Sequence, residues 1–102
     1  MGPPENADHA EIELGPETED AAGWAYAAAV FAAGRVHRCR LSLSFADYDL
    51  WCRGQHAPSR VARAALAWLV ERDGPAAVPV RLDCATLRRR FPDLDAELPG
   101  RV

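Results

Sequence analysis

The stretch VHRCRLSLSFAD, residues 36–47, says the most about how this chain folds. Its first eight residues alternate between two sets of side chains, which is the pattern of a β-strand. One set is mainly apolar and is expected to face the core, whereas the other places Arg38, Arg40 and Ser42 toward solvent. At Ser44 the pattern changes, because Ser44-Phe45-Ala46-Asp47 has the form of a capping box with Asp in place of Glu. We therefore expect a strand followed directly by a short helix.

Three helices are expected after this strand. The first covers residues 44–54, and the second covers residues 57–73, where a proline suits the first turn. A short extended segment over residues 78–82 separates the second helix from the third. The third helix covers residues 83–91 with an aspartate as its N-cap, and a final turn starts at Asp93.

Residues 21–33, which precede the strand, fit two different structures. Eight of these thirteen residues are Ala, acidic residues come before them and Gly34 follows, which favours a helix. Alternation between large and small side chains also fits a strand that turns back as a hairpin, with Trp24, Tyr26, Ala28 and Val30 on one face. The predicted fold class is therefore α+β: a β-hairpin, or a helix plus a strand, followed by three helices.

Charge divides the chain into two parts. Residues 1–20 carry seven acidic residues and no basic one, whereas residues 21–102 carry eight acidic residues and twelve arginines, a net charge of about +4. The first part has few large apolar side chains beyond Ile12 and Leu14, too few to offset the entropy cost of ordering it. We therefore predict a disordered acidic tail over residues 1–20 and one small α+β domain over residues 21–102.

Composition excludes several classes of protein. The chain has 102 residues, of which 49% are hydrophobic and 26% are charged, as in an ordinary globular domain. Its longest apolar run, residues 24–33, is about half as long as a membrane helix, so no membrane association is expected. Three cysteines without a secretory signal favour reduced thiols in the cytoplasm. There is no glycine-rich phosphate loop, and no cofactor is expected.

The strand and the two helices after it resemble a ribbon-helix-helix DNA-binding domain over residues 36–70. The resemblance rests on Arg38-Cys39-Arg40-Leu41-Ser42-Leu43-Ser44, on residues 45–54 and on residues 59–69. In that family two chains pair their strands into a ribbon that enters the major groove. The resemblance implies base contacts from Arg38, Arg40 and Ser42, and phosphate contacts near Ser59 and Arg60. A DNA-binding regulator or antitoxin is therefore the alternative function.

A second set of residues recurs in one order along most of the chain: Gly34-Arg35, Leu41-Ser42, Asp47-Tyr48 with Trp51, residues 68–72, Leu82-Asp83 and Phe91-Pro92. This order is similar to that of a group of small uncharacterised bacterial proteins. The chain differs from the group at Leu82, where the group carries Phe, and at Arg90, where it carries Tyr. The resemblance implies no function, but it favours a hairpin over residues 24–43.

Four side chains are of the types that bind zinc in structural sites: His37, Cys39, Cys52 and His56. His37 and Cys39 share one face of the expected strand, whereas Cys52 and His56 lie on either side of a helix end. The Cys-x₂-Cys pair that is common in small zinc domains is absent, which favours a core role for Cys39. Cys84 lies beside Asp83 but has no His nearby in the sequence, so no catalytic residue and no enzymatic activity are expected.

A protein-interaction role requires fewer specific sequence motifs than DNA binding, zinc binding or catalysis. Several large aromatic side chains either form the core or expose a binding patch: Trp24, Tyr26, Tyr48 and Trp51. Arg88, Arg89 and Arg90 form a basic cluster that could contact an acidic partner. We therefore expect a non-enzymatic interaction or regulatory protein that binds an unspecified protein partner, with a homodimer as one arrangement.

Overall fold

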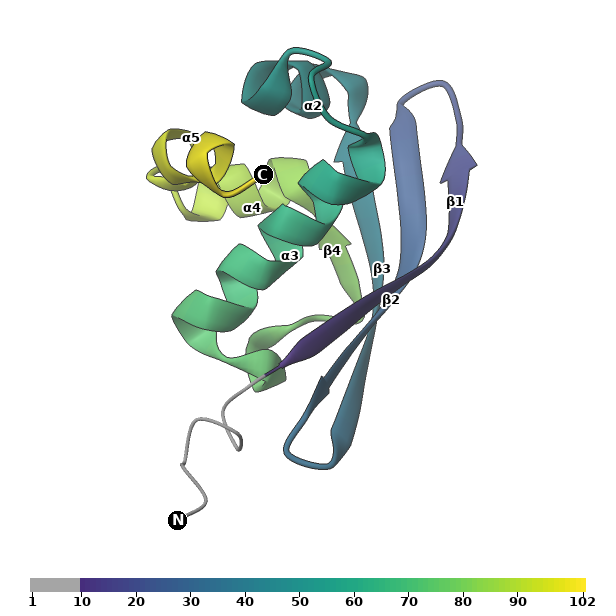
Figure 1. The fold of residues 1–102 in the computed structure, drawn as a ribbon, viewed down its shortest axis with the longest axis vertical. Helices are drawn as coiled ribbons and strands as arrows, with labels where there is room; N and C mark the ends of the chain where they lie inside the picture. Colours follow the sequence, from purple (N-terminus) through teal and green to yellow (C-terminus); the bar gives the residue numbers. More distant parts are fainter. Residues whose placement is uncertain (1–9) are drawn as a thin grey trace.

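The computed structural model describes residues 10–102, in which one sheet is packed against a layer of helices (Figure 1). The sheet has the order β1-β2-β3-β4, with β1 (Glu11–Glu19), β2 (Gly23–Ala32), β3 (Arg35–Ser44) and β4 (Arg81–Asp83). The helices are α2 (Phe45–Cys52), α3 (Pro58–Asp73), α4 (Cys84–Arg90) and α5 (Leu94–Glu97), with 3₁₀ turns η1 (Pro75–Ala77) and η2 (Leu98–Arg101). Strands β1, β2 and β3 are antiparallel, and β4 is parallel to β3. The α+β class is confirmed, but the sheet has four strands, and β4 separates α3 from α4.

The segment that fitted either a helix or a strand is the strand β2. It pairs with β3 over its whole length, from Gly23 opposite Ser44 to Ala32 opposite Arg35. The hairpin turns at Ala33 and Gly34, whose φ angles are 53° and 75°, the left-handed geometry of a two-residue turn. The helix propensity of the alanines is overridden because β2 gains backbone partners on both of its edges.

The disordered tail predicted over residues 1–20 is wrong for Glu11–Glu19, which form β1. Ile12 and Leu14 lie opposite Val30 and Ala28 of β2 and pack against the core. Two apolar side chains are enough here, because β2 supplies the backbone hydrogen bonds and the rest of the core already exists. Residues 1–9 of the predicted tail lie outside the described residues.

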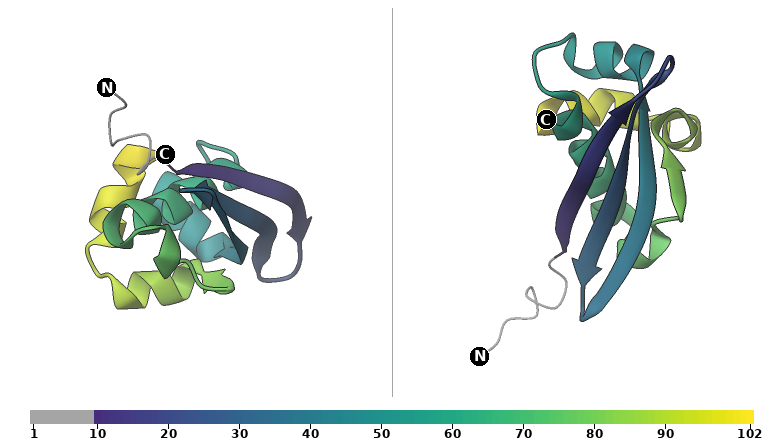
Figure 2. Two further views of the ribbon diagram at one scale, coloured as in Figure 1. Left: turned by 90° about the horizontal axis from the view of Figure 1, so that it is seen from below. Right: turned by 90° about the vertical axis from the view of Figure 1, so that its right-hand side faces the viewer.

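The helix layer and one face of the sheet enclose the hydrophobic core. Side chains that are almost fully buried come from every layer, among them Tyr26, Val30, Leu41, Leu43, Val61, Leu66, Leu69, Leu87, Leu94 and Leu98. All described helices lie on this side of the sheet, which Figure 2 shows from two further directions. No helix of the described part is long and apolar enough to cross a membrane.

Local signals placed the helix boundaries correctly. The Ser44 hydroxyl accepts a hydrogen bond from the backbone N–H of Asp47 at 3.0 Å, as the capping box predicts. The Asp83 carboxylate accepts one from the backbone N–H of Ala85 at 3.2 Å, and Pro58 occupies the first turn of α3. These caps position α2 and α4 at the end of the sheet where β3 and β4 finish.

Candidate functional site on the uncovered face of the sheet

Strand β2 is apolar on both of its faces. Tyr26, Ala28 and Val30 point into the core beneath the helices. The alternate side chains point to the opposite face of the sheet: Ala25, Ala27, Ala29 and Phe31. A strand without polar residues is typical of a sheet that is covered on both faces. The described helices cover only one of them (Figure 2), so the second face is a candidate binding surface.

The strand register gives this uncovered face an ordered charge pattern. Glu13 of β1 lies opposite Ala29 of β2, which lies opposite Arg38 of β3. One row further along, Ala27 lies opposite Arg40, which lies opposite Arg81 of β4. The face therefore runs from acidic on β1, through small and apolar on β2, to basic on β3 and β4.

A shallow groove of about 450 Å³ follows the alanines across this face; its lining includes Glu13, Ala27, Ala29, Arg38, Arg40 and Val80. The alanine side chains form its floor because they rise less from the sheet than the charged side chains on either side. Two larger apolar side chains stand on the basic side, Val36 with 46% and Val80 with 79% of their surface exposed.

The charged side chains of this face have no ion-pair partners among residues 10–102. The salt bridges of that region join Arg72, Arg88 and Arg101 to acidic residues, all on the helix side of the molecule. Arg38, Arg40 and Glu13 are exposed and take part in none of them. Their charges are therefore available to a second molecule.

The residues predicted to contact DNA are not brought together. Arg38, Arg40 and Ser42 lie on the uncovered face, as predicted. Ser59 and Arg60 lie at the start of α3 in the helix layer, where they line a pocket with Glu17 and Tyr26. Strand β3 pairs with β2 along one edge and with β4 at residues 40–42 on the other, so its hydrogen-bonding partners come from the same chain.

The aromatic side chains predicted as a binding patch belong mainly to the core. Tyr26 and Trp51 are 1% and 3% exposed. Trp24 is half-buried and makes an edge-to-face contact with the half-buried Tyr48, with ring centroids 5.0 Å apart. Tyr26 and Trp51 therefore lie in the core, whereas Trp24 and Tyr48 pack against it and stay partly exposed.

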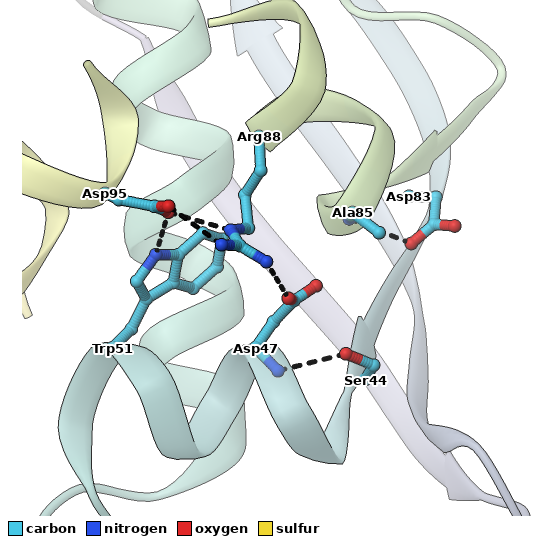
Figure 3. A network of polar contacts seen from close by, with 7 residues as sticks. All are labelled: Ser44, Asp47, Trp51, Asp83, Ala85, Arg88 and Asp95. Atoms are coloured by element: carbon cyan, nitrogen blue, oxygen red, sulfur yellow. Dashed lines mark hydrogen bonds and ion pairs between the residues drawn. The ribbon is translucent and has the colours of Figure 1, made fainter. Parts of the chain in front are cut away.

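The predicted basic cluster divides into three separate environments. Arg89 is exposed and donates to the Thr86 hydroxyl at 3.1 Å, and Arg90 stacks over the Phe91 ring at 5.1 Å. Arg88 instead points inward to the carboxylates of Asp47 and Asp95 (Figure 3). The three arginines therefore do not act as one patch.

The Arg88 network joins α4 to the neighbouring helix α5 and to α2, which is distant in sequence (Figure 3). Arg88 of α4 donates through Nη1 to Asp47 of α2 and through Nε and Nη2 to both oxygens of Asp95 of α5, each at 2.8 Å. The indole N–H of Trp51 donates to Asp95 as well, also at 2.8 Å. Asp47 is 3% exposed, and its Oδ2 has no hydrogen-bond partner among the described residues. Such a partly buried, charge-assisted network fixes the relative positions of the helices.

Acid is expected to weaken the fold through this network. The hydrogen bond from Arg88 lowers the pKa of Asp95 below its ordinary value of 3.8, and the Trp51 hydrogen bond lowers it further. Because the folded pKa is lower than the unfolded one, ionised Asp95 stabilises the protein fully above about pH 4. That stabilisation disappears as the pH falls through the folded pKa.

We expect the melting temperature to stay level from neutral pH down to about pH 5 and to fall below about pH 4. Circular dichroism melts at a series of pH values measure this. The fall is expected to be shallower in Arg88→Ala, because Asp95 then has an ordinary pKa. Asp93, whose pKa is lowered by Arg72, still contributes its own pH-dependent stabilisation in this variant. An equally steep fall in both proteins contradicts the role given to Arg88.

The four residues considered as zinc ligands do not form a metal site. His37 lies near the hairpin end of β3, about 23 Å of strand away from Ser44, where α2 begins. Cys52 and His56 lie at and beyond the other end of α2, and the Cys39 side chain is buried in the core. In the part of the chain that the structure describes, no three His, Cys, Asp or Glu side chains lie close enough to hold a metal ion.

A second cavity, of about 770 Å³, lies on the helix side between the hairpin end of the sheet and the end of α3. Small apolar side chains make up most of its lining, and its charged or titratable groups are Arg35, His37 and Glu71. Its rim includes Ala10, the first described residue. These groups do not converge on one point with a nucleophile, so the cavity offers less recognisable chemistry than the uncovered face.

Comparison of the chain with protein-family models, with curated proteins and with solved structures finds no significant match. The resemblances to ribbon-helix-helix domains and to a group of small bacterial proteins stay predictions.

Proposed function

We propose that the protein is a non-enzymatic protein-binding module, and that the uncovered face of the sheet is its binding surface. The observation that carries the proposal is β2, a central strand with no charged side chain in ten residues and with helices on only one side. On this face Ala25 and Ala29 are only 9% and 8% exposed, so the apolar surface that β2 leaves in water comes mainly from the exposed Ala27 and the half-buried Phe31. A partner protein that covers the face gains the free energy of burying that apolar surface.

The arrangement of side chains supports a protein as the partner. Small apolar residues lie in the centre of the face and charged residues lie around them, which is the anatomy of a protein–protein interface. The floor of alanines lets a flat surface approach closely. The unpaired charges at the rim, Glu13 on one side and Arg38 and Arg40 on the other, select the partner and its orientation.

The cysteines favour a binding role over thiol catalysis. Cys39, Cys52 and Cys84 are all free and buried. Burial raises the pKa of the Cys39 and Cys84 thiols, which disfavours the nucleophilic thiolate. We further propose that the protein acts in the cytoplasm, where free thiols stay reduced, as a regulatory partner of another protein.

One observation favours a second candidate function, nucleic-acid binding. Arg38 and Arg40 on β3 and Arg81 on β4 are exposed on the same face, without ion-pair partners among the described residues. Glu11 and Glu13 on the neighbouring edge of that face would repel phosphates, so this candidate ranks second. Its signature is binding to DNA or RNA that weakens steeply as salt is added.

The first proposal is tested by placing a photo-crosslinking amino acid on each side of the full-length protein. Position 27 is exposed at the centre of the uncovered face, and position 63 is exposed on α3 as the matched control. After irradiation in the expressing cells, we expect discrete adducts from position 27 and none from position 63. Mass spectrometry then identifies the adduct, and the purified pair is titrated by calorimetry.

The titration decides the outcome. Placing a charge on the apolar floor through Ala27→Glu is expected to weaken the complex at least about tenfold, because the carboxylate is desolvated without a partner. Arg63→Glu is expected to leave the affinity unchanged. Equal adducts from both positions, no protein adduct from position 27, or an affinity that Ala27→Glu does not change would each overturn the proposal.

A further inference from the structure

We propose that the partner on the uncovered face is a second copy of this chain, packed face to face about a two-fold axis that runs along β2. This inference rests on the proposed function, since it names the partner of the same surface. It is carried by the charge pattern of the face, which complements itself.

Symmetry determines which residues meet. Rotation by 180° about an axis along β2 places β1 of one copy over β3 of the other, because β1 and β3 flank β2 on opposite sides. Neighbouring strands are about 4.8 Å apart, so β1 and β3 lie at equal distances from the axis. Every acidic position of β1 is therefore placed over a position of β3 in the second copy.

The register places opposite charges at the same height along the axis. Glu13, Ala29 and Arg38 occupy one row across β1, β2 and β3. In the dimer, Glu13 of each copy faces Arg38 of the other, which gives two equivalent ion pairs on either side of the axis. In the next row Phe31 lies on the axis and meets its own copy, while Glu11 of each copy faces the exposed Val36 of the other.

The alanines fit this arrangement in a second way. Two sheets pack about 10 Å apart when ordinary side chains interdigitate between them. Ala25, Ala27 and Ala29 lie along the axis, where each would meet its own copy and lets the two sheets approach closely, whereas Phe31 at the hairpin end of the same strand is a large side chain on the axis. Small residues at the centre and long charged residues at the sides are what a two-fold face-to-face contact requires.

The size of the face sets the expected affinity. With the axis along β2, only β1, β2 and β3 overlap between the copies; strands about 33 Å long and three strands about 14 Å across give an overlap of about 450 Å². A stable interface buries about 800 Å² per partner, which makes this contact small and its dissociation constant micromolar. Because a two-fold contact uses the same surface on both copies, the assembly closes at two chains.

Charge reversal of the full-length protein tests the inference by sedimentation equilibrium over about 1–500 µM chain. We expect the wild type to pass from one chain to two over this range. Arg38→Glu alone and Glu13→Arg alone are each expected to weaken the dimer at least about tenfold, because each places two like charges opposite one another.

Mixing the two variants gives the decisive measurement. A chain with two acids at positions 13 and 38 faces a chain with two bases, so both ion pairs are restored and the mixture is expected to dimerise about as well as the wild type. The double variant Glu13→Arg/Arg38→Glu is expected to recover dimerisation as well. Arg63→Glu, on α3, is the control that leaves the dimer unchanged, and circular dichroism confirms that every variant is folded.

Three results would overturn the second-copy inference: a single chain at every concentration, unchanged dimers in both single variants, or no dimer in their mixture. If the adduct from position 27 is a different protein whose affinity falls with Ala27→Glu, the proposed function stands and this inference fails. If the wild type stays a single chain and binds DNA with a steep salt dependence that Arg38→Glu removes, nucleic acid is the ligand and both fail.

Discussion

Replacement of Arg88 by alanine is expected to lower the free energy of unfolding by about 3 kcal/mol, because it leaves the buried Asp47 carboxylate without a countercharge. Asp47 is 3% exposed, and Arg88 is its ion-pair partner at 2.8 Å. The expected loss is at the lower end of the range for buried pairs, because 32% of the Arg88 side chain is exposed. In a domain of about 100 residues this loss lowers the melting temperature by about 12 °C or more.

Urea denaturation followed by circular dichroism measures this loss, with Arg89→Ala as the matched control. Arg89 is the next residue, is exposed and donates only to Thr86 within its own helix, so its replacement is expected to cost less than about 0.5 kcal/mol. Adding Asp47→Asn to Arg88→Ala is expected to recover part of the loss, because the amide removes the buried charge. A loss below about 1 kcal/mol in Arg88→Ala contradicts the structural importance of the network.

Replacement of Gly23 by alanine is expected to be similarly destabilising, by about 3 kcal/mol, because the new methyl group has no space. A Cβ atom at this position would lie 2.1 Å from the carbonyl oxygen of Leu43 and 2.7 Å from Cα of Ser44. Both are backbone atoms of β3, so the clash is relieved only if β2 and β3 separate at this end. Separation also disturbs Trp24, which follows Gly23 and packs edge to face on Phe45 at the start of α2.

The same denaturation experiment measures this effect, with Gly100→Ala as the control. A Cβ atom at Gly100 meets no atom within 4 Å, so this substitution is expected to change the free energy of unfolding by less than about 0.5 kcal/mol. If Gly23→Ala is as stable as Gly100→Ala, this result contradicts the close approach of β2 to β3 at Gly23.

Stability and binding use different sides of the molecule. The Arg88 network and the buried apolar side chains lie between the sheet and the helices, whereas Glu13, Ala27 and Arg38 lie on the other face of the sheet. Variants of the uncovered face are therefore expected to change association without lowering the melting temperature of the single chain, measured at concentrations below the dissociation constant of the dimer. Variants of the network are expected to do the opposite, which makes the two sets of experiments independent controls for one another.

Local patterns in the sequence predict the second half of the fold well. Alternation over residues 36–43 identified β3 and its two faces, and Ser44 and Asp83 identified the starts of α2 and α4. These features depend on the period of the side chains and on capping groups a few residues apart, so they can be recognised without knowledge of the tertiary structure.

The first half could not be assigned in this way. The alanines of β2 fit a helix and a strand equally well, and Glu11–Glu19 were expected to be disordered because only Ile12 and Leu14 are apolar. Both segments become strands because each lies beside a strand that supplies hydrogen bonds and a core that buries alternate side chains. Pairing of this kind depends on the neighbour and not on the segment alone.

The candidate site shows the same division. The sequence identified Arg38 and Arg40 as outward-facing residues of one strand, since alternation along a strand is a local property. Three other features of the site depend on the order of strands in the sheet. Glu13 shares the face of the two arginines, alanines lie between Glu13 and the arginines, and no described helix covers them. Likewise, Asp47 and Arg88 are 41 residues apart, and no periodicity connects them. The sequence determines the faces of single elements, whereas the packing of the elements determines which faces are buried, which remain exposed and which charges meet.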